Sequence, residues 1–262
     1  SQGFGVAAHI TADFGSQPID GRLGLAWPSI SSSNATPPLQ NLLDQMDQPI
    51  FTVFMTRNQE ANASVSDGGM ITFGGLDKEH CDDKVNYVPL NSQTFWQFKL
   101  DDFAIGGYQA HASYSEVLTD MSSWFIGVPL DAMNGILAQT GAQFDSTNQL
   151  YKLPCNGKYP DMVFKIGGID YYVPSFEYVV DLGITPAGMC TLAMKGAAER
   201  MNDPQTFVLG APFMRQFCQV YDVGQARIGF ARSVNVDTST GAGSSLSMIF
   251  LLLSAIIALL IQ

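Results

Sequence analysis

Basic residues are scarce in this chain. Its 262 residues include 13 Lys and Arg against 24 Asp and Glu, which gives a formal net charge of −11. Proteins bind nucleic acid through clustered Lys and Arg that meet its phosphates, so the composition argues against nucleic acid as a partner. An acidic surface suits plain solubility, and it equally suits an acidic compartment where many carboxylates are protonated.

Patterns that bind metals or nucleotides are missing as well. No C-x-x-C pair occurs, and the three histidines, His9, His80 and His111, stand far apart. We therefore expect no metal site. The sequence also lacks a glycine-rich phosphate loop, and we expect no cofactor.

The cysteines and two glycosylation sequons point to an oxidising compartment. Four widely spaced cysteines, an even number, fit two structural disulfides of a protein on the secretory pathway. The cysteines are Cys81, Cys155, Cys190 and Cys218. N-x-[ST] sequons begin at Asn34 and Asn62, which predicts glycosylation of these two side chains.

The two ends of the chain carry their own signals. Ser1 is not an initiator methionine and no signal-peptide pattern follows it, so a signal peptide is expected upstream. Residues 234–245 read as a flexible linker and residues 246–262 as a hydrophobic tail. As a helix, the sixteen-residue apolar run of the tail would reach ~24 Å, short of the roughly 30 Å hydrocarbon core.

Two kinds of anchor fit this tail. One is a GPI-attachment signal with its acceptor region at Asp237 to Ser239, and the other is a slightly short C-terminal transmembrane anchor. Either would hold the protein at a membrane, at the cell surface or in an acidic endolysosomal compartment.

Between the ends, the sequence predicts a β-rich fold. Short apolar runs punctuated by Gly, Asp and Asn are typical of strands. Strands are expected at 51–55, 70–73, 98–100, 103–105, 162–166, 171–173 and 227–230. The pairs Gly106-Gly107 and Gly167-Gly168 are expected to form hairpin turns.

Helical patterns are few. They cover 37–46 after a Thr36 cap, 130–139 and 212–217. Long sheets with a few short helices exclude a doubly wound nucleotide-binding fold.

The stretch from Val117 to Pro129 reads as strand, tight loop, second strand and helix start, with Asp120 at the loop tip. Asp120 fits a catalytic acid or base, and it also fits a turn residue bonding its own backbone. Elsewhere, Gly24 and Gly210 follow apolar residues in similar patterns. Because a strand glycine lets another backbone approach closely, we expect two similar lobes, each with a loop threaded beside its glycine.

Several segments together resemble the pepsin-like aspartic peptidases, the eukaryotic acid proteases, and are most similar to nematode members. The likeness runs in order from about residue 3 to residue 232. It rests on Gln17 to Ser29, Gly68 to Asp77, Phe95 to Phe98, Phe207 to Phe217, Val220 to Asp222 and Arg227 to Ala231.

The resemblance implies an all-β bilobal fold. An incomplete N-terminal lobe would occupy residues 1–80 and a full C-terminal lobe residues 81–233. The resemblance also implies a Cys155–Cys190 disulfide and makes a Cys81–Cys218 disulfide plausible.

In this family, two aspartates from the two lobes share a proton and activate a water for peptide-bond hydrolysis without a metal. The stretch Phe125 to Pro129 fixes the register, so Asp120 falls on the second catalytic position. Around it the motif is degenerate. Met121 replaces Thr or Ser, Ser122 replaces Gly, and Trp124 replaces a small hydroxyl residue. Met121 therefore cannot donate the hydrogen bond between the lobes, and Ser122 is expected to strain the loop, because it adds a Cβ where the loop favours none.

The first Asp-Thr-Gly motif and the flap of the family have no counterpart in this sequence, which reads as N-terminally truncated. Unpaired strand edges are therefore expected within residues 1–80. The resemblance implies an aspartic-type endopeptidase, which hydrolyses the peptide bonds of a peptide or protein substrate in its cleft. A lone Asp120 lacks the second carboxylate that this reaction needs, so we expect negligible turnover by this chain. The alternative is a catalytically silent pseudoenzyme that binds peptides and keeps the fold.

Overall fold

In the computed structural model, residues 35–56, 68–110, 116–196 and 205–234 are described, with 2, 3, 5, 6, 8, 9, 21 and 23–31. Every structural statement below refers to these residues. The expected glycosylation sites, Asn34 and Asn62, and the tail at 246–262 lie outside them.

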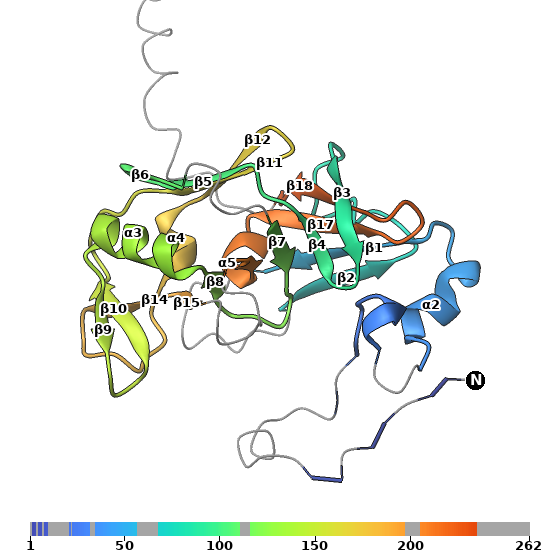
Figure 1. The fold of residues 1–262 in the computed structure, drawn as a ribbon, viewed down its shortest axis with the longest axis horizontal. Coiled ribbons are helices and arrows are strands. Elements are labelled where there is room, and N and C mark those ends of the chain that lie inside the picture. The colour runs from blue at the N-terminus through green and yellow to red at the C-terminus, as the bar shows by residue number, and fades with distance from the viewer. Residues whose placement is uncertain are drawn as a thin grey trace, which may run out of the picture.

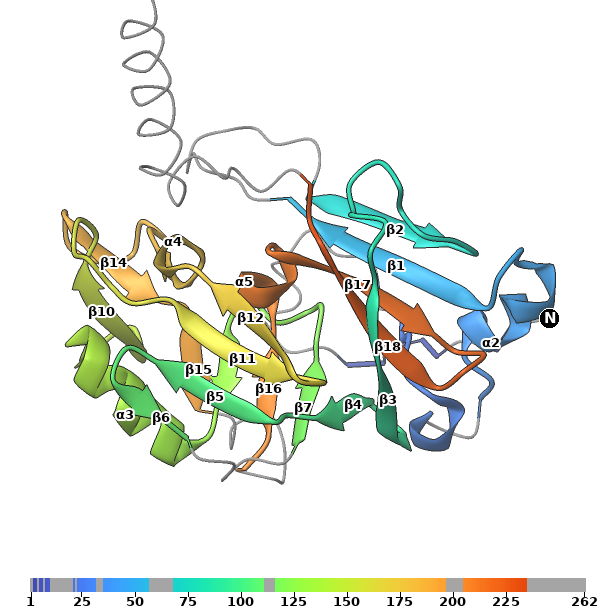
Figure 2. The same cartoon turned by 90° about the horizontal axis from the view of Figure 1, so that it is seen from above.

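Strands dominate the fold (Figures 1 and 2), which confirms the predicted all-β class. Ten strands form one sheet in the order β15-β8-β16-β7-β4-β3-β18-β17-β1-β2, and two four-stranded sheets have the orders β13-β14-β10-β9 and β12-β11-β5-β6. The strands are β1 (Ile50–Met55), β2 (Gly69–Phe73), β3 (Asn86–Gln93), β4 (Trp96–Lys99), β5 (Asp102–Ile105), β6 (Tyr108–Gln109), β7 (Glu116–Thr119), β8 (Ile126–Val128), β9 (Gln143–Asp145), β10 (Leu150–Pro154), β11 (Met162–Ile166), β12 (Ile169–Val173), β13 (Val179–Val180), β14 (Met189–Leu192), β15 (Met194–Gly196), β16 (Phe207–Leu209), β17 (Phe217–Asp222) and β18 (Arg227–Arg232).

Helices are short, as the sequence predicts. They are the 3₁₀ turns η1 (Pro28–Ile30) and η3 (Leu43–Gln45) and the α-helices α2 (Pro38–Leu42), α3 (Leu130–Thr140), α4 (Ser175–Tyr178) and α5 (Ala211–Met214). The expected Thr36 cap is wrong, because Pro37 occupies the N-cap of α2 and makes no side-chain cap hydrogen bond. Prolines fix φ near the helical value, so the helix begins at Pro38 without a hydroxyl cap.

The two glycine pairs form the expected hairpins. β11 and β12 are joined through Gly167 and Gly168, whose φ angles are 58° and 78°. Two successive positive φ values favour glycine, and they suit a tight hairpin turn. β5 and β6 are joined in the same way through Gly106, with φ 54°.

Strand β3 connects two parts of the large sheet. Its first half, Asn86 to Pro89, pairs with β18, and its second half, Leu90 to Gln93, pairs with β4. The register shifts between Leu90 and Ser92. Such an irregularity bends a strand, so the sheet changes direction here. Figure 2 shows β1, β2 and β17 gathered on one side, away from β10, β11 and α3.

Strands from the first eighty residues share a sheet with the end of the chain. β1 pairs with β17, with Phe51 opposite Tyr221, and β2 pairs with β1 at the edge of the sheet. Met70 and Phe73 of this edge strand are 49% and 44% exposed. The division of the chain at residue 80 stays a prediction, although the sheet crosses it.

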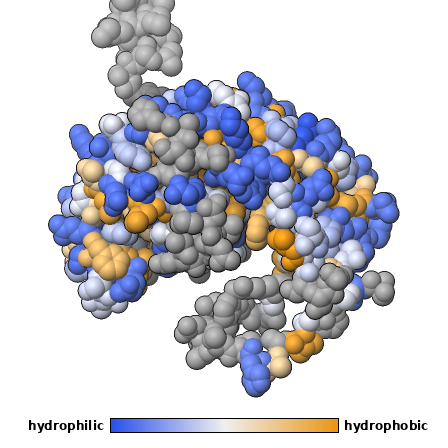
Figure 3. Space-filling view, in the orientation of Figure 1, coloured by the Kyte–Doolittle hydropathy of each residue, from blue (hydrophilic) through white to orange (hydrophobic). Residues whose placement is uncertain are grey.

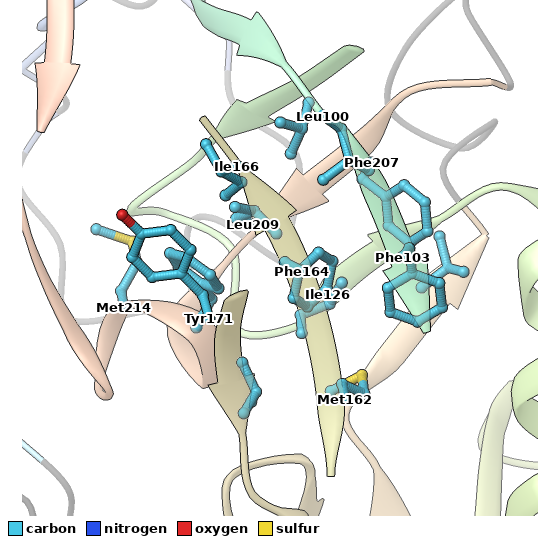
Figure 4. Packing of buried hydrophobic residues seen from close by; sticks show 14 of the residues in the cluster. Leu100, Phe103, Ile126, Met162, Phe164, Ile166, Tyr171, Phe207, Leu209 and Met214 are labelled. Carbon is cyan, nitrogen blue, oxygen red and sulfur yellow. The ribbon is translucent and has the colours of Figure 1, made fainter. Parts of the chain in front are cut away.

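Aromatic and aliphatic side chains pack together in the core between the β12-β11-β5-β6 sheet and the large sheet (Figure 4). The ring centroids of Phe103 and Phe207 are 4.8 Å apart, and those of Phe164 and Phe213 are 5.7 Å apart at a right angle. All four side chains are fully buried. Burial of aromatic area on this scale is the main stabilising contribution to such a fold.

Hydrophilic side chains dominate the face drawn in Figure 3, with apolar ones scattered among them. This distribution agrees with the strongly acidic composition.

The structure contains two disulfides. Cys155 follows β10 and bonds Cys190 on β14, which pairs with β10. Cys81 bonds Cys218 on β17, where Phe54 and Ala231 pack around it. The second bond therefore ties the segment after β2 to the sheet that β1 and β2 join.

Loss of the Cys81–Cys218 bond will destabilise the protein more than loss of Cys155–Cys190. In the chain-entropy account, closing loops of 137 and 35 residues contributes about 5 and about 4 kcal/mol respectively. Urea denaturation of Cys81→Ala/Cys218→Ala and Cys155→Ala/Cys190→Ala will show this order. Equal losses of unfolding free energy, or the reverse order, would contradict the prediction that the disulfide closing the longer loop stabilises the protein more.

Candidate active site

The Asp120 loop has the strand–loop–strand–helix form that the sequence predicts. β7 ends at Thr119, β8 starts at Ile126, and Pro129 is the N-cap of α3. Asp120 is the first residue beyond β7 and is partly exposed. The loop thus presents the carboxylate at the end of a buried strand.

Backbone hydrogen bonds fix the loop against β16. The Asp120 N–H donates to Leu209 O at 3.0 Å, and the Ala211 N–H donates to Ser123 O at 2.8 Å. Within the loop, the Ser123 N–H donates to Asp120 O at 3.0 Å. Because β16 also pairs with both β7 and β8, the loop is held from both ends.

Gly210 makes this close approach possible. A Cβ placed on it would lie 2.3 Å from Phe125 O and 2.6 Å from Ser123 O, too close for any side chain. The expectation of a loop threaded beside this glycine is therefore met. Gly24 differs, since a Cβ placed on it would have nothing within 4 Å, and the matching close approach expected there is wrong for this structure.

The Asp120 carboxylate is held by its own loop. Its Oδ1 accepts hydrogen bonds from the Ser122 N–H at 2.9 Å and from the Ser122 hydroxyl at 2.7 Å. This is the geometry of a turn Asp that bonds its own backbone, which is one of the two roles that the sequence allows for Asp120. The two hydrogen bonds also fix the carboxylate in one orientation, as a ligand-binding group requires. The turn role and a ligand-binding role are therefore compatible.

The substitutions around Asp120 are accommodated in three ways. Met121 packs its side chain against the main core. Ser122 was expected to strain the loop with its Cβ, but the residue has no positive φ and its hydroxyl bonds Asp120. Trp124 is 77% exposed. The steric penalty expected at Ser122 is therefore wrong, whereas Met121 does lack a hydroxyl.

A buried polar group lies beside the loop that sequence reasoning missed. The Tyr221 hydroxyl is 3.1 Å from Thr119 Oγ1 and 2.5 Å from Gln219 Oε1. Burial raises the pKa of the Tyr221 phenol well above its ordinary value, the Thr119 hydrogen bond lowers it in part, and the charge of Asp120 raises it again. The signal available in the sequence was Thr119, a β-branched hydroxyl residue directly before Asp120.

Two further findings concern the described part of the chain. Within it, no three His, Cys, Asp or Glu side chains come together as a group able to hold a metal ion. None of its helices combines the length and the apolar character needed to cross a membrane.

Comparison with known proteins settles the family. A family model described as eukaryotic aspartyl protease matches residues 1–233. The chain belongs to this family. It is 43% identical over 234 residues to aspartic protease 17 of Caenorhabditis elegans, covering 88% of this chain and 59% of that protein.

Other aspartyl proteases are similar as well. Aspartic protease 1 of C. elegans is 41% identical over 239 residues, covering 90% of this chain and 59% of the relative. Pepsin A of Bos taurus is 32% identical over 219 residues, covering 82% and 56%. The expected family, with its likeness to nematode members, is confirmed. The chain spans little more than half the length of these aspartyl proteases.

Substitution of Gly210 will disrupt the aspartyl protease loop. Gly210→Ala forces its Cβ into two backbone carbonyls that cannot move independently, and we expect a loss of about 2–4 kcal/mol in unfolding free energy. Gly75→Ala is the matched control, since nothing lies within 4 Å of a Cβ there. Thermal unfolding of both variants checks this. A Gly210→Ala protein as stable as Gly75→Ala would contradict the close threading.

Proposed function

We propose that this aspartyl protease family member binds peptides through the Asp120 loop and hydrolyses them negligibly. The observation that carries the proposal is the geometry of Asp120. The expectation that Asp120 occupies the family's second catalytic position is supported by its place on a loop fixed by backbone hydrogen bonds to β16, with its carboxylate oriented by Ser122.

The chemistry of hydrolysis explains the expected lack of turnover. One ionised carboxylate must take a proton from water while a protonated partner supports the developing oxyanion, and like charges so close share one proton. Asp120 supplies one carboxylate in this register. Met121 packs against the core in place of the hydroxyl residue that braces the family's two loops against each other.

Aspartic endopeptidase activity is the second candidate. It is favoured by the match of the family model over residues 1–233 and by 43% identity to a relative named an aspartic protease. The two candidates differ in one respect, because both require peptide binding near Asp120 and only the second requires turnover.

Peptide binding will depend on Asp120. At acidic pH, we expect the protein to bind pepstatin, Asp120→Ala to weaken that binding at least tenfold, and hydrolysis of unfolded globin to stay at the level of the blank. Asp131→Ala is the matched control, because Asp131 is an exposed carboxylate in the first turn of α3.

Three outcomes separate the candidates. Pepstatin-sensitive hydrolysis that Asp120→Ala abolishes would establish the endopeptidase and contradict the silent binder. Pepstatin binding that both variants retain equally would place the peptide elsewhere. No binding by the unaltered protein would remove the peptide-binding function altogether.

For localisation, we propose the secretory pathway with attachment to a membrane directed by residues 246–262, either as a GPI-attachment signal or as a transmembrane anchor. The two disulfides support an oxidising compartment, and the apolar run of the tail supports attachment. A phosphatidylinositol-specific phospholipase will release the protein from membranes if the anchor is GPI. Retention in the membrane would favour the transmembrane anchor, and a protein that never sediments with membranes would contradict both.

A further inference from the structure

The Tyr221 hydroxyl joins two strands that the sheet order keeps apart. Tyr221 lies on β17 and Thr119 on β7, with β18, β3 and β4 between them. Four spacings of a flat sheet would separate the two strands by about 19 Å. The 3.1 Å contact between the hydroxyls therefore shows that the sheet curls back on itself. The irregularity in β3 provides the bend.

The direction of the hydrogen bonds follows from the chemistry of the three groups. A phenol has one proton, and the Gln219 Oε1 at 2.5 Å can only accept. The Tyr221 hydroxyl is the donor toward both Thr119 Oγ1 and Gln219 Oε1, so its single proton is shared between these two acceptors. The Thr119 side chain is therefore held by the Tyr221 hydroxyl, and the N–H of the next residue, Asp120, donates to Leu209 O.

The surroundings make this bond rigid. Tyr221 is 1% exposed, its ring stacks on Phe51 at 4.4 Å, and it meets Trp96 edge-on at 4.8 Å. Trp96 belongs to β4, which pairs with β7. Hydrogen bonds in such an apolar enclosure are stronger than in water and cannot be replaced by solvent.

We propose that Tyr221 is a positioning residue for Asp120. By holding Thr119, it fixes the strand end from which the carboxylate projects. The inference rests on the proposed role of Asp120 in peptide binding, and it adds the residue that keeps this carboxylate in place.

Amide hydrogen exchange tests the proposal without any ligand. In Tyr221→Phe, the Asp120 and Ser122 amides will exchange at least tenfold faster than in the unaltered protein, relative to amides in β10. Tyr178→Phe is the matched control, because Tyr178 is equally buried and donates its hydroxyl to Pro160 O. It removes a buried phenol oxygen from a different site, so the ratio of the Asp120 and Ser122 exchange rates to those of the reference amides will stay as in the unaltered protein.

Substitutions of Thr119 distinguish the effect of its hydroxyl from the effect of its packing. Thr119→Val keeps the shape and will reproduce the faster exchange, whereas Thr119→Ser keeps the hydroxyl and will restore slow exchange. Equal ratios in Tyr221→Phe and Tyr178→Phe, or fast exchange in Thr119→Ser, would overturn the positioning role.

A double-mutant cycle on pepstatin binding tests whether Tyr221 acts through Asp120. Tyr221→Phe will weaken pepstatin binding when Asp120 is present and will have no further effect in an Asp120→Asn protein. The same loss in both backgrounds would show that Tyr221 does not act through Asp120. If the unaltered protein binds no pepstatin, the proposed function fails, and the exchange ratios still decide whether Tyr221 positions the loop.

Discussion

The threading of one backbone past another at Gly210 is the contact on which the candidate site depends. Two carbonyls, of Ser123 and Phe125, occupy the space where any side chain at 210 would lie. The hydrogen bonds on either side, from Asp120 to Leu209 and from Ala211 to Ser123, then lock the loop to β16. The position of Asp120 is thus set by backbone groups, which substitutions of loop side chains leave in place.

This explains how a degenerate motif can keep its shape. Met121 packs against the core, and Ser122 donates to Asp120 through both its N–H and its hydroxyl, so the residues interpreted from the sequence as departures from the family's motif fit this loop. Geometry and chemistry are separable here. In the function proposed here, the oriented Asp120 carboxylate serves peptide binding, while hydrolysis demands a second carboxylate and a shared proton.

The large sheet gives the same loop a second support. The bend at β3 brings β17 close to β7, so that Tyr221 of β17 contacts Thr119, the residue directly before Asp120. The Cys81–Cys218 bond fastens the segment after β2 to β17. The early strands β1 and β2 therefore contribute to the site indirectly, through Phe51 stacked against Tyr221.

Local features of the sequence were predictable, and long-range contacts were not. The glycine hairpins and the start of α3 after Pro129 follow from turn chemistry and periodicity within a few residues. The Thr36 cap failed because neighbouring prolines preset the helix start. The Tyr221–Thr119 bond depends on curvature of a sheet whose strands lie a hundred residues apart, and no local pattern encodes that curvature.

The most direct test of peptide binding at Asp120 is an amide chemical-shift map recorded on adding pepstatin at acidic pH. Shifts concentrated at the amides of Asp120, Ser122 and Gly210, and absent from β9 and β10, are the result predicted here. Shifts confined to other surfaces, with the Asp120 loop unmoved, would contradict the assignment of this loop as the peptide-binding site.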